Sequence, residues 1–384
     1  MPGFGKGAEP LRRLNVLVVG GPPWSEDINQ PATQMAQAFS RDGHAVTYLC
    51  RPRQSSRLRG VAGRGRRRKA PSITASGIRV EYLAGVAEAL PLTAPVLRLL
   101  QRRLLMRTIA RAESHYGPYD ATLLYWWFFP EIVDRLPGVV LYDAIDEHHA
   151  YPINAGRRRH NARTLAWEER TSAAADVVTT VSSAALERLK TTNPSAHLLP
   201  NGFDVALFAD LQVELDSTAV VSCRVGYAGG VGKRIDWDLV RRLSLARPGY
   251  DFVFAGGGER PYDLPDNVRF LGAMRYPDIL LTVASAAVTI IPFVNDEFTR
   301  GSDFLKAYDY LALGKVVVST PLPSLVRLGE RYPEHILLPK RDEEWLQALD
   351  HVIASSGASR DRPDLTAAST DVRARRLASL LADN

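Results

Sequence analysis

Short apolar runs that end in glycine or polar residues alternate along the chain with segments of helical periodicity. The first run, residues 14–20, is rich in valine and leucine and predicts a buried parallel strand. A helix over residues 31–39 follows, and a turn at Asp42, Gly43 and His44 leads into a strand over residues 45–49. The first fifty residues therefore predict a βαβ unit, whose crossover should be right-handed.

The same alternation continues in two consecutive series. Further strands are predicted over residues 78–83, 120–125, 139–143, 176–181 and 197–199, and in the second series over 221–227, 251–255, 268–271, 288–293 and 316–319. Helices are predicted over residues 94–112, 164–174, 183–190, 236–246, 277–286, 303–313, 343–353 and 371–381. Two such series predict an α/β protein with two doubly wound, Rossmann-like lobes that face each other across a cleft.

The boundary between the predicted lobes falls near residue 205. Residues 1–205 would form the N-terminal lobe and residues 206–365 the C-terminal lobe. A last helix within residues 366–384 is a candidate to cross back to the N-terminal lobe. Ligands of doubly wound sheets bind outside the carboxyl ends of the strands, where loops run into helix N-termini, so the site is expected between the lobes.

The composition agrees with two globular domains. The chain has 384 residues, of which 46% are apolar and 23% charged, enough for two sizeable cores. No apolar run reaches the roughly 18 residues of a membrane-spanning helix. Cys50 and Cys223 lie far apart without the pattern of a disulfide framework, so a reducing cytoplasm is the expected location.

Positive charge is concentrated in one tract. The net charge is +6, and the tract from Arg51 to Lys69 contains arginine and lysine but no acid. It is either a solvated loop or a surface that attracts phosphate from nucleic acid, lipid or a phosphorylated ligand. Together with the basic, leucine-containing helix over residues 94–112, it offers a peripheral contact with the inner face of a membrane. No nucleic-acid-binding module is recognised, so no nucleic acid is expected as a partner.

Several segments together resemble glycosyltransferase family 4 and its relatives in the GT-B superfamily. The segments are FSRDGHAVTYL, AADVVTTVSSAALERL, LLPNGFDVALF, VGYAGGVGKRIDWDLV and, most specifically, DFLKAYDYLALGKVVVST. Their order and spacing cover nearly the whole chain. The resemblance implies a GT-B fold and a metal-independent transferase without a tightly bound cofactor. It would move a sugar, of the hexosyl type, from a UDP-, GDP- or dTDP-sugar to a hydroxyl of a small-molecule, saccharide or lipid-linked acceptor.

One position departs from the family pattern. Family members often have two glutamates eight positions apart near the donor, and here Asp309 takes the place of the second. The position eight residues earlier is Gly301, which carries no acid. Asp296, Glu297 and Asp303 lie nearby with different spacing. The resemblance therefore leaves the first acid unassigned.

Two segments of the C-terminal lobe are candidates to bind the donor. Glycines after a strand let the backbone approach a phosphate, and neighbouring cations neutralise it. The start of the helix over residues 303–313 offers free N–H groups to an anion, with Ser302 as a helix cap. By resemblance, Asp309 would bind the ribose and Arg275 would lie beside the base. The candidate donor-binding residues are Gly229, Gly230, Lys233, Arg234, Arg275, Ser302, Asp303, Phe304, Leu305, Lys306 and Asp309.

The N-terminal lobe supplies the candidates for acceptor binding and proton transfer. Asp146 and then His148 are the candidate catalytic residues, because they follow a strand and would project into the cleft. The loop over residues 20–24 and the aromatic cluster over residues 125–129 are expected to recognise the acceptor, which makes Gly21, Trp24, Trp126 and Trp127 the acceptor-binding candidates. Aromatic faces stack on sugars and flat acceptors, although such aromatic runs are often core. The retaining and inverting outcomes both stay open, and no metal site is expected in this acidic and histidine-rich run.

Other functions agree with parts of the same sequence. A sugar-nucleotide epimerase with the GT-B fold would bind the same donor and need no acceptor pocket. A non-catalytic protein that binds nucleic acid or a partner would use the arginine tract and tolerate the loss of Asp309. The absence of an acid at Gly301 is compatible with a catalytically silent two-lobed protein.

Overall fold

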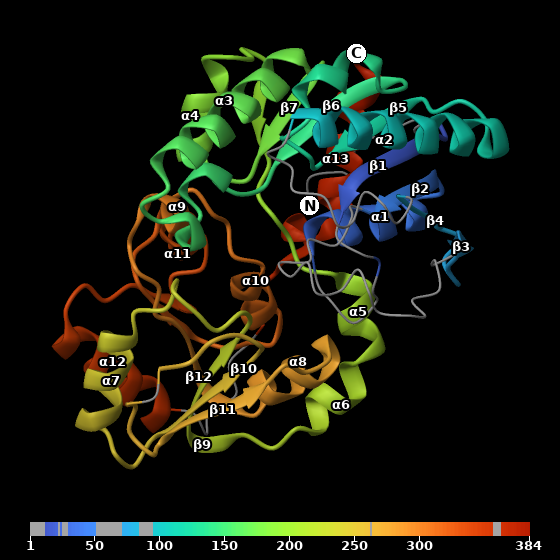
Figure 1. The fold of residues 1–384 in the computed structure, drawn as a ribbon. Helices are drawn as coiled ribbons and strands as arrows, with labels where there is room; N and C mark the ends of the chain where they lie inside the picture. The colour runs from blue at the N-terminus through green and yellow to red at the C-terminus, as the bar shows by residue number, and fades with distance from the viewer. Residues whose placement is uncertain are drawn as a thin grey trace, which may run out of the picture.

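Two parallel sheets, each covered by helices, form the two lobes of the chain in a computed structural model (Figure 1). The structure describes residues 12–21, 24, 30–50, 71–83, 95–261, 263–355 and 362–384. The tract from Arg51 to Lys69 lies outside these residues. Among the helices that are described, none is long and apolar enough to cross a membrane.

The N-terminal lobe contains an eight-stranded sheet in the order β3-β4-β2-β1-β5-β6-β7-β8. Seven strands are parallel, and β3 pairs antiparallel with β4 at the edge. The central strands are almost completely buried, as expected for a parallel sheet covered on both faces. The strands are β1 (Asn15–Gly21), β2 (Ala45–Cys50), β3 (Ser72–Ile73), β4 (Arg79–Tyr82), β5 (Ala121–Leu124), β6 (Val139–Ala144), β7 (Val177–Thr180) and β8 (Ala196–Leu198).

Helices and short 3-10 turns cover this sheet. The Ser182 side chain caps α4 by accepting a hydrogen bond from the backbone of Ala185. The elements are α1 (Pro31–Arg41), α2 (Pro95–Tyr116), η3 (Pro130–Arg135), η4 (His148–Ala150), η5 (Pro152–Asn154), α3 (Arg158–Ala174) and α4 (Ser183–Lys190).

The C-terminal lobe contains a six-stranded parallel sheet in the order β11-β10-β9-β12-β13-β14. Its strands are β9 (Val221–Ala228), β10 (Asp251–Ala255), β11 (Val268–Gly272), β12 (Ala286–Ile291), β13 (Val317–Ser319) and β14 (Ile336–Leu337). Its helices are α5 (Val205–Asp210), α6 (Gln212–Ser217), α7 (Trp237–Ala246), α8 (Tyr276–Ala284), α9 (Glu297–Arg300), α10 (Leu305–Ala312), α11 (Pro323–Arg331) and α12 (Asp342–Ala354). The prediction of two doubly wound lobes is confirmed.

The last helix, α13 (Thr370–Ala382), follows the turn η6 (Thr366–Ala368) and packs beside α1 in the N-terminal lobe (Figure 1). Its apolar side chains, Leu377 among them, belong to the same core cluster as β1 and β2. Arg373 donates to both carboxylate oxygens of Asp143 at the end of β6, at 2.9 Å each, and both side chains are buried. The first and last parts of the chain therefore share one core.

The structure corrects several element boundaries. The helix predicted to begin at Asp303 begins at Leu305, with Phe304 as an N-cap that makes no side-chain capping bond. Ser302 therefore does not cap that helix. Its hydroxyl instead donates to the carbonyl of Phe298, 2.9 Å away in the preceding turn. The sequence also gave no indication of α11, whose proline, serine and glycine obscure an amphipathic helix.

Candidate active site

Two glycine-rich loops follow neighbouring strands of the C-terminal lobe and pack against each other. Gly229 and Gly256 both have positive φ angles, of 119° and 147°, which favour glycine. The backbone of Gly229 donates to the carbonyl of Ala255 at 2.9 Å. A side chain at Gly256 would overlap the carbonyl of Gly229, and one at Gly258 the carbonyl of Val231. The loop at Gly229 and Gly230 is therefore held in one conformation at the carboxyl end of β9.

Lys306, in the first turn of α10, reaches this loop. Its Nζ donates to the Tyr227 hydroxyl at 2.7 Å and lies over the Tyr227 and Phe293 rings, 4.0 and 4.6 Å from their centroids. A Cβ atom at Gly229 would lie only 2.8 Å from Nζ. Burial, with the nearby charge of Arg234, holds the pKa of Lys306 well below its usual value. An arriving anion would restore the charged form.

The structure separates the two cations of the loop. Arg234 is half-buried, and its guanidinium lies over Phe293 and Phe298, 5.8 and 5.5 Å from the ring centroids. It also acts electrostatically on Lys306 and on Asp146. Lys233 is exposed. Arg234 and Lys306 therefore form the pair of cations that the fold brings together.

Asp309 lies one turn further along α10. Its side chain is buried, and its Oδ1 has no hydrogen-bond partner among the described residues. Burial raises its pKa from 3.8 to about 7, against the lowering effect of a hydrogen bond from Tyr276. Lys306 bonds to Tyr227 and does not pair with Asp309. This oxygen can therefore accept a hydrogen bond from a ligand.

The residues between Ser302 and Lys306 have different surroundings. Asp303 accepts from the backbone of Asn201 at 2.7 Å, from Tyr308 at 2.8 Å and from Arg327 at 3.1 Å, so protein donors occupy its carboxylate. Phe304 is buried against Phe293, and Leu305 is half-buried at the start of α10. Through its bond to Asn201, Asp303 ties the segment between the lobes to the start of α10.

Arg275 precedes Tyr276, the residue that bonds to Asp309. It is exposed and forms two hydrogen bonds with Asp278 in the first turn of α8, at 2.9 and 3.1 Å. The fold brings its loop to the carboxyl end of β11. Its guanidinium is turned toward its own helix.

Asp146 brings the N-terminal lobe into contact with the start of α10. Its Oδ1 accepts from the Ser302 hydroxyl at 3.3 Å. Burial raises the pKa of Asp146, although His148 and Arg234 lower it. The His148 ring stacks on Trp127 with centroids 5.3 Å apart. Asp146 and His148 therefore lie at the surface where the two lobes meet.

The aromatic candidates divide between core and surface. Trp126 is 3% exposed and packs where a side chain at Gly20 would overlap its indole ring, so it is core. Trp127 and Trp24 are half-buried. Trp24 packs edge-on against Tyr48, and Gly21 ends β1. Of the three candidate tryptophans, Trp127 is the one whose ring stacks on His148.

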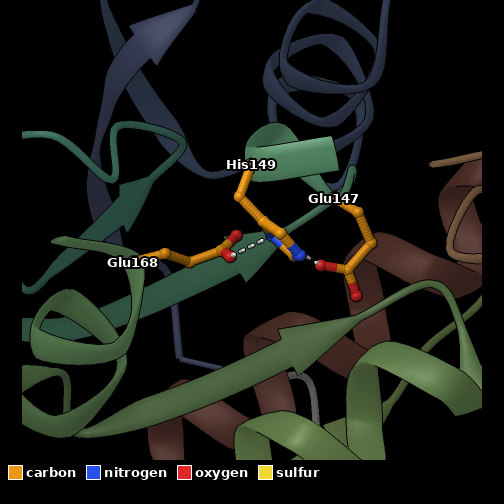
Figure 2. Close-up of side chains that lie close together, drawn as sticks. All are labelled: Glu147, His149 and Glu168. Carbon is orange, nitrogen blue, oxygen red and sulfur yellow. Dashed lines mark ion pairs between the residues drawn. The ribbon is translucent and has the colours of Figure 1, made fainter. Parts of the chain in front are cut away.

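A buried charged network next to Asp146 has no counterpart in the sequence predictions. Glu147, His149 and Glu168 lie together (Figure 2), with potential ligand atoms within 4.8 Å of one another. Arg188 donates to Glu147 at 2.7 Å and to Glu168 at 2.9 Å, so both carboxylates are already paired with a protein cation. The only sequence signal was the acidic and histidine-rich run after β6.

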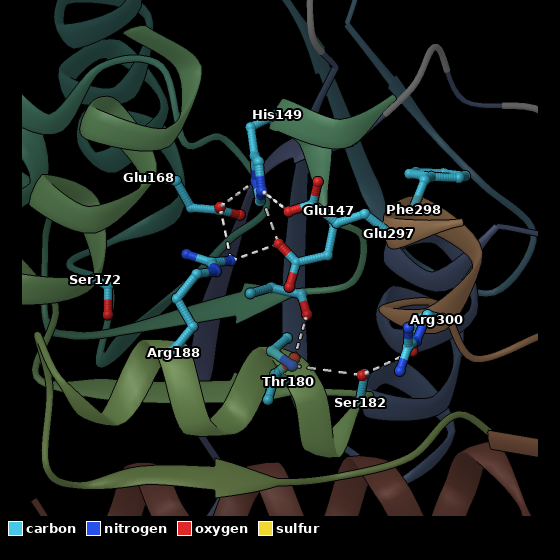
Figure 3. Close-up of polar contacts among 12 residues, drawn as sticks. Glu147, His149, Glu168, Ser172, Thr180, Ser182, Arg188, Glu297, Phe298 and Arg300 are labelled. Carbon is cyan, nitrogen blue, oxygen red and sulfur yellow. Dashed lines mark hydrogen bonds and ion pairs between the residues drawn. The ribbon is translucent and has the colours of Figure 1, made fainter. Parts of the chain in front are cut away.

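His149 links this network to the other lobe (Figure 3). Its Nδ1 lies 3.3 Å from Glu147, and its Nε2 lies 3.0 Å from Glu297 at the start of α9. Hydrogen bonding to Glu168 raises the pKa of His149, as do the carboxylates of Glu297 and Glu147, despite burial. The network therefore places positive charge between acids that belong to both lobes.

Comparisons with known proteins follow the same architecture. No protein-family model matches the chain. Over 185 residues, 44% of the chain, it is 21% identical to the putative teichuronic acid biosynthesis glycosyltransferase TuaH of Bacillus subtilis, of which 46% is covered. Over 138 residues, 30% of the chain, it is 27% identical to the GDP-mannose-dependent monoacylated alpha-(1-6)-phosphatidylinositol monomannoside mannosyltransferase of Corynebacterium glutamicum, of which 36% is covered. The chain thus matches less than half the length of either relative.

The likeness in structure extends much further along the chain. Sucrose-phosphate synthase from Thermosynechococcus elongatus superimposes with a TM-score of 0.64 and 16% identity, covering 96% of this chain and 95% of that protein. Both lobes and their order are included in that match. The chain therefore has the GT-B fold, and parts of its sequence are similar to two glycosyltransferases.

Proposed function

We propose that this protein transfers a sugar from a nucleoside diphosphate sugar to a hydroxyl group of an acceptor. The observation that carries the proposal is the meeting of Arg234, Lys306 and the start of α10 at the glycine loop of Gly229. Breaking the bond to the sugar builds negative charge on the leaving diphosphate. Fixed cations and exposed helix amides stabilise that charge without having to reorganise.

The donor would lie in the C-terminal lobe with its diphosphate over this loop. Lys306 would exchange its hydrogen bond to Tyr227 for a phosphate oxygen and take up a proton as it does so. Because Gly229 has no side chain, its own backbone and the Nζ of Lys306 can both approach the same phosphate. Two side-chain cations supply the neutralisation for which other phosphate sites use a metal ion, so we propose a metal-independent reaction.

Asp309 would accept hydrogen bonds from the ribose hydroxyls. Its Oδ1 is buried and has no hydrogen-bond partner in the described part of the chain, and a hydroxyl donor would satisfy it. The acceptor would approach from the N-terminal lobe beside Trp127 and His148. Asp146, whose pKa is raised by burial, is the proposed group that takes the proton of the acceptor hydroxyl, with His148 beside it.

The proposed location is cytoplasmic, with a lipid-linked acceptor reached at a membrane surface. The name of the Corynebacterium relative describes a lipid acceptor. On α2, Leu99 and Leu100 are 41% and 40% exposed and lie beside the exposed Arg103 and Arg107. Apolar side chains flanked by arginines are typical of a helix that rests on anionic lipid.

Nucleotide binding and transfer are tested in sequence. UDP, GDP or dTDP should raise the melting temperature of the protein, and saturation at about 100 times Kd stabilises by roughly 2.7 kcal/mol. Arg234→Ala and Lys306→Ala should each abolish most of this shift, whereas Lys233→Ala, which removes the same charge from the neighbouring position, should have a smaller effect. Incubation with the matching sugar nucleotide should then release the diphosphate in the presence of an acceptor.

Two results would contradict the proposal. One is a protein that none of the three diphosphates stabilises. The other is an Arg234→Ala variant that keeps the shift of the wild type. Conversion of the sugar nucleotide to its epimer without transfer would assign the chain to the epimerases instead.

A further inference from the structure

Gly301 is surrounded by a side chain from the other lobe. A Cβ atom built at Gly301 would overlap the Cγ of Glu147 and would lie 3.3 Å from both the Cβ and the Cδ of that residue. Glu147 follows β6 in the N-terminal lobe, whereas Gly301 ends α9 in the C-terminal lobe. The glutamate therefore fills the space that a side chain at position 301 would need.

The backbone at Gly301 does not itself require glycine. Its φ and ψ angles are −86° and −3°, within the right-handed helical region that every residue adopts. The three atoms nearest to a Cβ built there all belong to Glu147, which is 5% exposed and tightly held. This distinguishes Gly301 from Gly229, whose positive φ favours glycine wherever its neighbours lie.

Glu147 cannot withdraw easily. Arg188 on α4 donates to its Oε2 at 2.7 Å, and His149 lies 3.3 Å from the same oxygen (Figure 3). Arg188 is in turn bound to Glu168, whose other oxygen accepts from the Tyr142 hydroxyl at 3.1 Å. The side chain is therefore fixed by two helices and a strand of the N-terminal lobe.

Further contacts between the lobes surround the same point. Ser182 lies 3.5 Å from the carbonyl of Arg300 (Figure 3). Tyr151 packs edge-on against Phe298, with ring centroids 4.7 Å apart. Asp146 accepts a hydrogen bond from the hydroxyl of Ser302, the residue that follows Gly301. Helix α9 and the first residues of the turn to α10 therefore contact the N-terminal lobe at several points.

We propose that Glu147 is a positioning residue of the donor site, which sets the place of the turn at Gly301 by filling, from the opposite lobe, the space of the side chain missing there. The inference rests on the proposed function, because that turn leads directly into Lys306 and the free amides of α10. Glu147 touches no substrate. It acts by holding the turn in the position in which Lys306 and Arg234 face the same phosphate.

A double-mutant cycle tests whether the two positions share one space. Gly301→Ala should force the turn away from the N-terminal lobe and weaken binding of UDP, GDP or dTDP by about tenfold or more, since small misplacements of binding groups have large effects. Glu147→Ala should also weaken binding, by leaving the turn unsupported. The combination of both substitutions should bind better than Gly301→Ala alone, because the new methyl group enters the vacated space.

Glu147→Gln separates shape from charge. Glutamine fills the same volume, and its carbonyl can still accept from Arg188, so binding should stay within about threefold of the wild type. Gly249→Ala is the matched control, because an added Cβ at that exposed glycine meets no atom within 4 Å and its φ is not positive. Additive losses in the cycle, or Glu147→Gln as weak as Glu147→Ala, would overturn the inference.

Hydrogen exchange keeps this test separate from the proposed function. In the free protein, amides of residues 301–306 should exchange faster in Gly301→Ala and in Glu147→Ala than in the wild type and in Gly249→Ala. This result supports the inference even where no nucleotide binds. Unchanged exchange overturns it even where nucleotides bind. One equivalent of zinc in the purified wild type, absent from Glu168→Gln, would also overturn it by making the network a metal site.

Discussion

Asp309 combines burial, an unpartnered oxygen and a raised pKa in one side chain. Because the folded protein binds its proton more tightly than the unfolded chain does, this residue adds stability at low pH. That contribution is lost as the pH rises from 3.8 through about 7. The ionised form is the better acceptor for ribose hydroxyls. Nucleotide affinity should therefore rise over the same pH range in which the free energy of unfolding falls.

Asp309→Asn should therefore alter the pH dependence of stability. Between pH 5 and pH 9, the free energy of unfolding of the variant should decline less than that of the wild type, by up to about 3 kcal/mol. Urea unfolding at both pH values measures the difference, since other titrating groups are common to the two proteins. Parallel pH profiles would show that Asp309 is already ionised at pH 5.

At the level of single residues, the sequence predicted which residue types would lie near the site but not how each side chain would be oriented. Lys233 and Arg234 are adjacent and both basic, yet only Arg234 turns toward Lys306. Glu168 lies in the middle of a helix, and its contact with Arg188 depends on packing between α3 and α4. Such contacts follow from the assembled fold and leave no periodic signal in the chain.

Among the elements, the longer strands were predicted well because valine-rich and isoleucine-rich runs bounded by glycine mark buried parallel strands. The two-residue edge strands β3 and β14 were not predicted. Helix starts were less predictable. The Ser302-Asp303 pair has the composition of a helix cap, but the side chains of both residues bond to more distant partners, and the helix begins at Leu305. Tertiary contacts here override a local capping preference.

The contacts that dock α13 include one buried ion pair. Arg373 and Asp143 are 3% and 0% exposed, so Arg373→Ala leaves a carboxylate buried without its cation. This substitution should lower the free energy of unfolding by roughly 3–5 kcal/mol. Denaturant unfolding measures the loss, and Arg376→Ala, at an exposed position of the same helix, should change stability by less than about 0.5 kcal/mol. Equal effects at the two positions would contradict the importance of the pair.

At the scale of the whole molecule, the proposed membrane contact makes a prediction about vesicles. The protein should sediment with vesicles that contain anionic lipid and not with neutral ones, and added salt should release it. Arg103→Glu with Arg107→Glu on α2 should weaken this binding at least about tenfold, because each basic residue near the surface contributes roughly 1 kcal/mol. The same reversals at the exposed Arg375 and Arg376 serve as the control. If both charge-reversed pairs weakened vesicle binding equally, the effect would come from net charge alone, and the proposed contact through α2 would be wrong.

The packing of α13 also has a consequence for the order in which the protein is made. The ribosome releases the strands of the N-terminal lobe first, yet Leu377 and its neighbours, which complete the core around β1 and β2, emerge only after the entire C-terminal lobe. Until then, the apolar face that α13 will cover stays exposed on the growing chain, and the buried Asp143 lacks its cation. The lobe that is synthesised first is thus finished last, and nascent chains that stall before residue 370 should be the ones that chaperones hold.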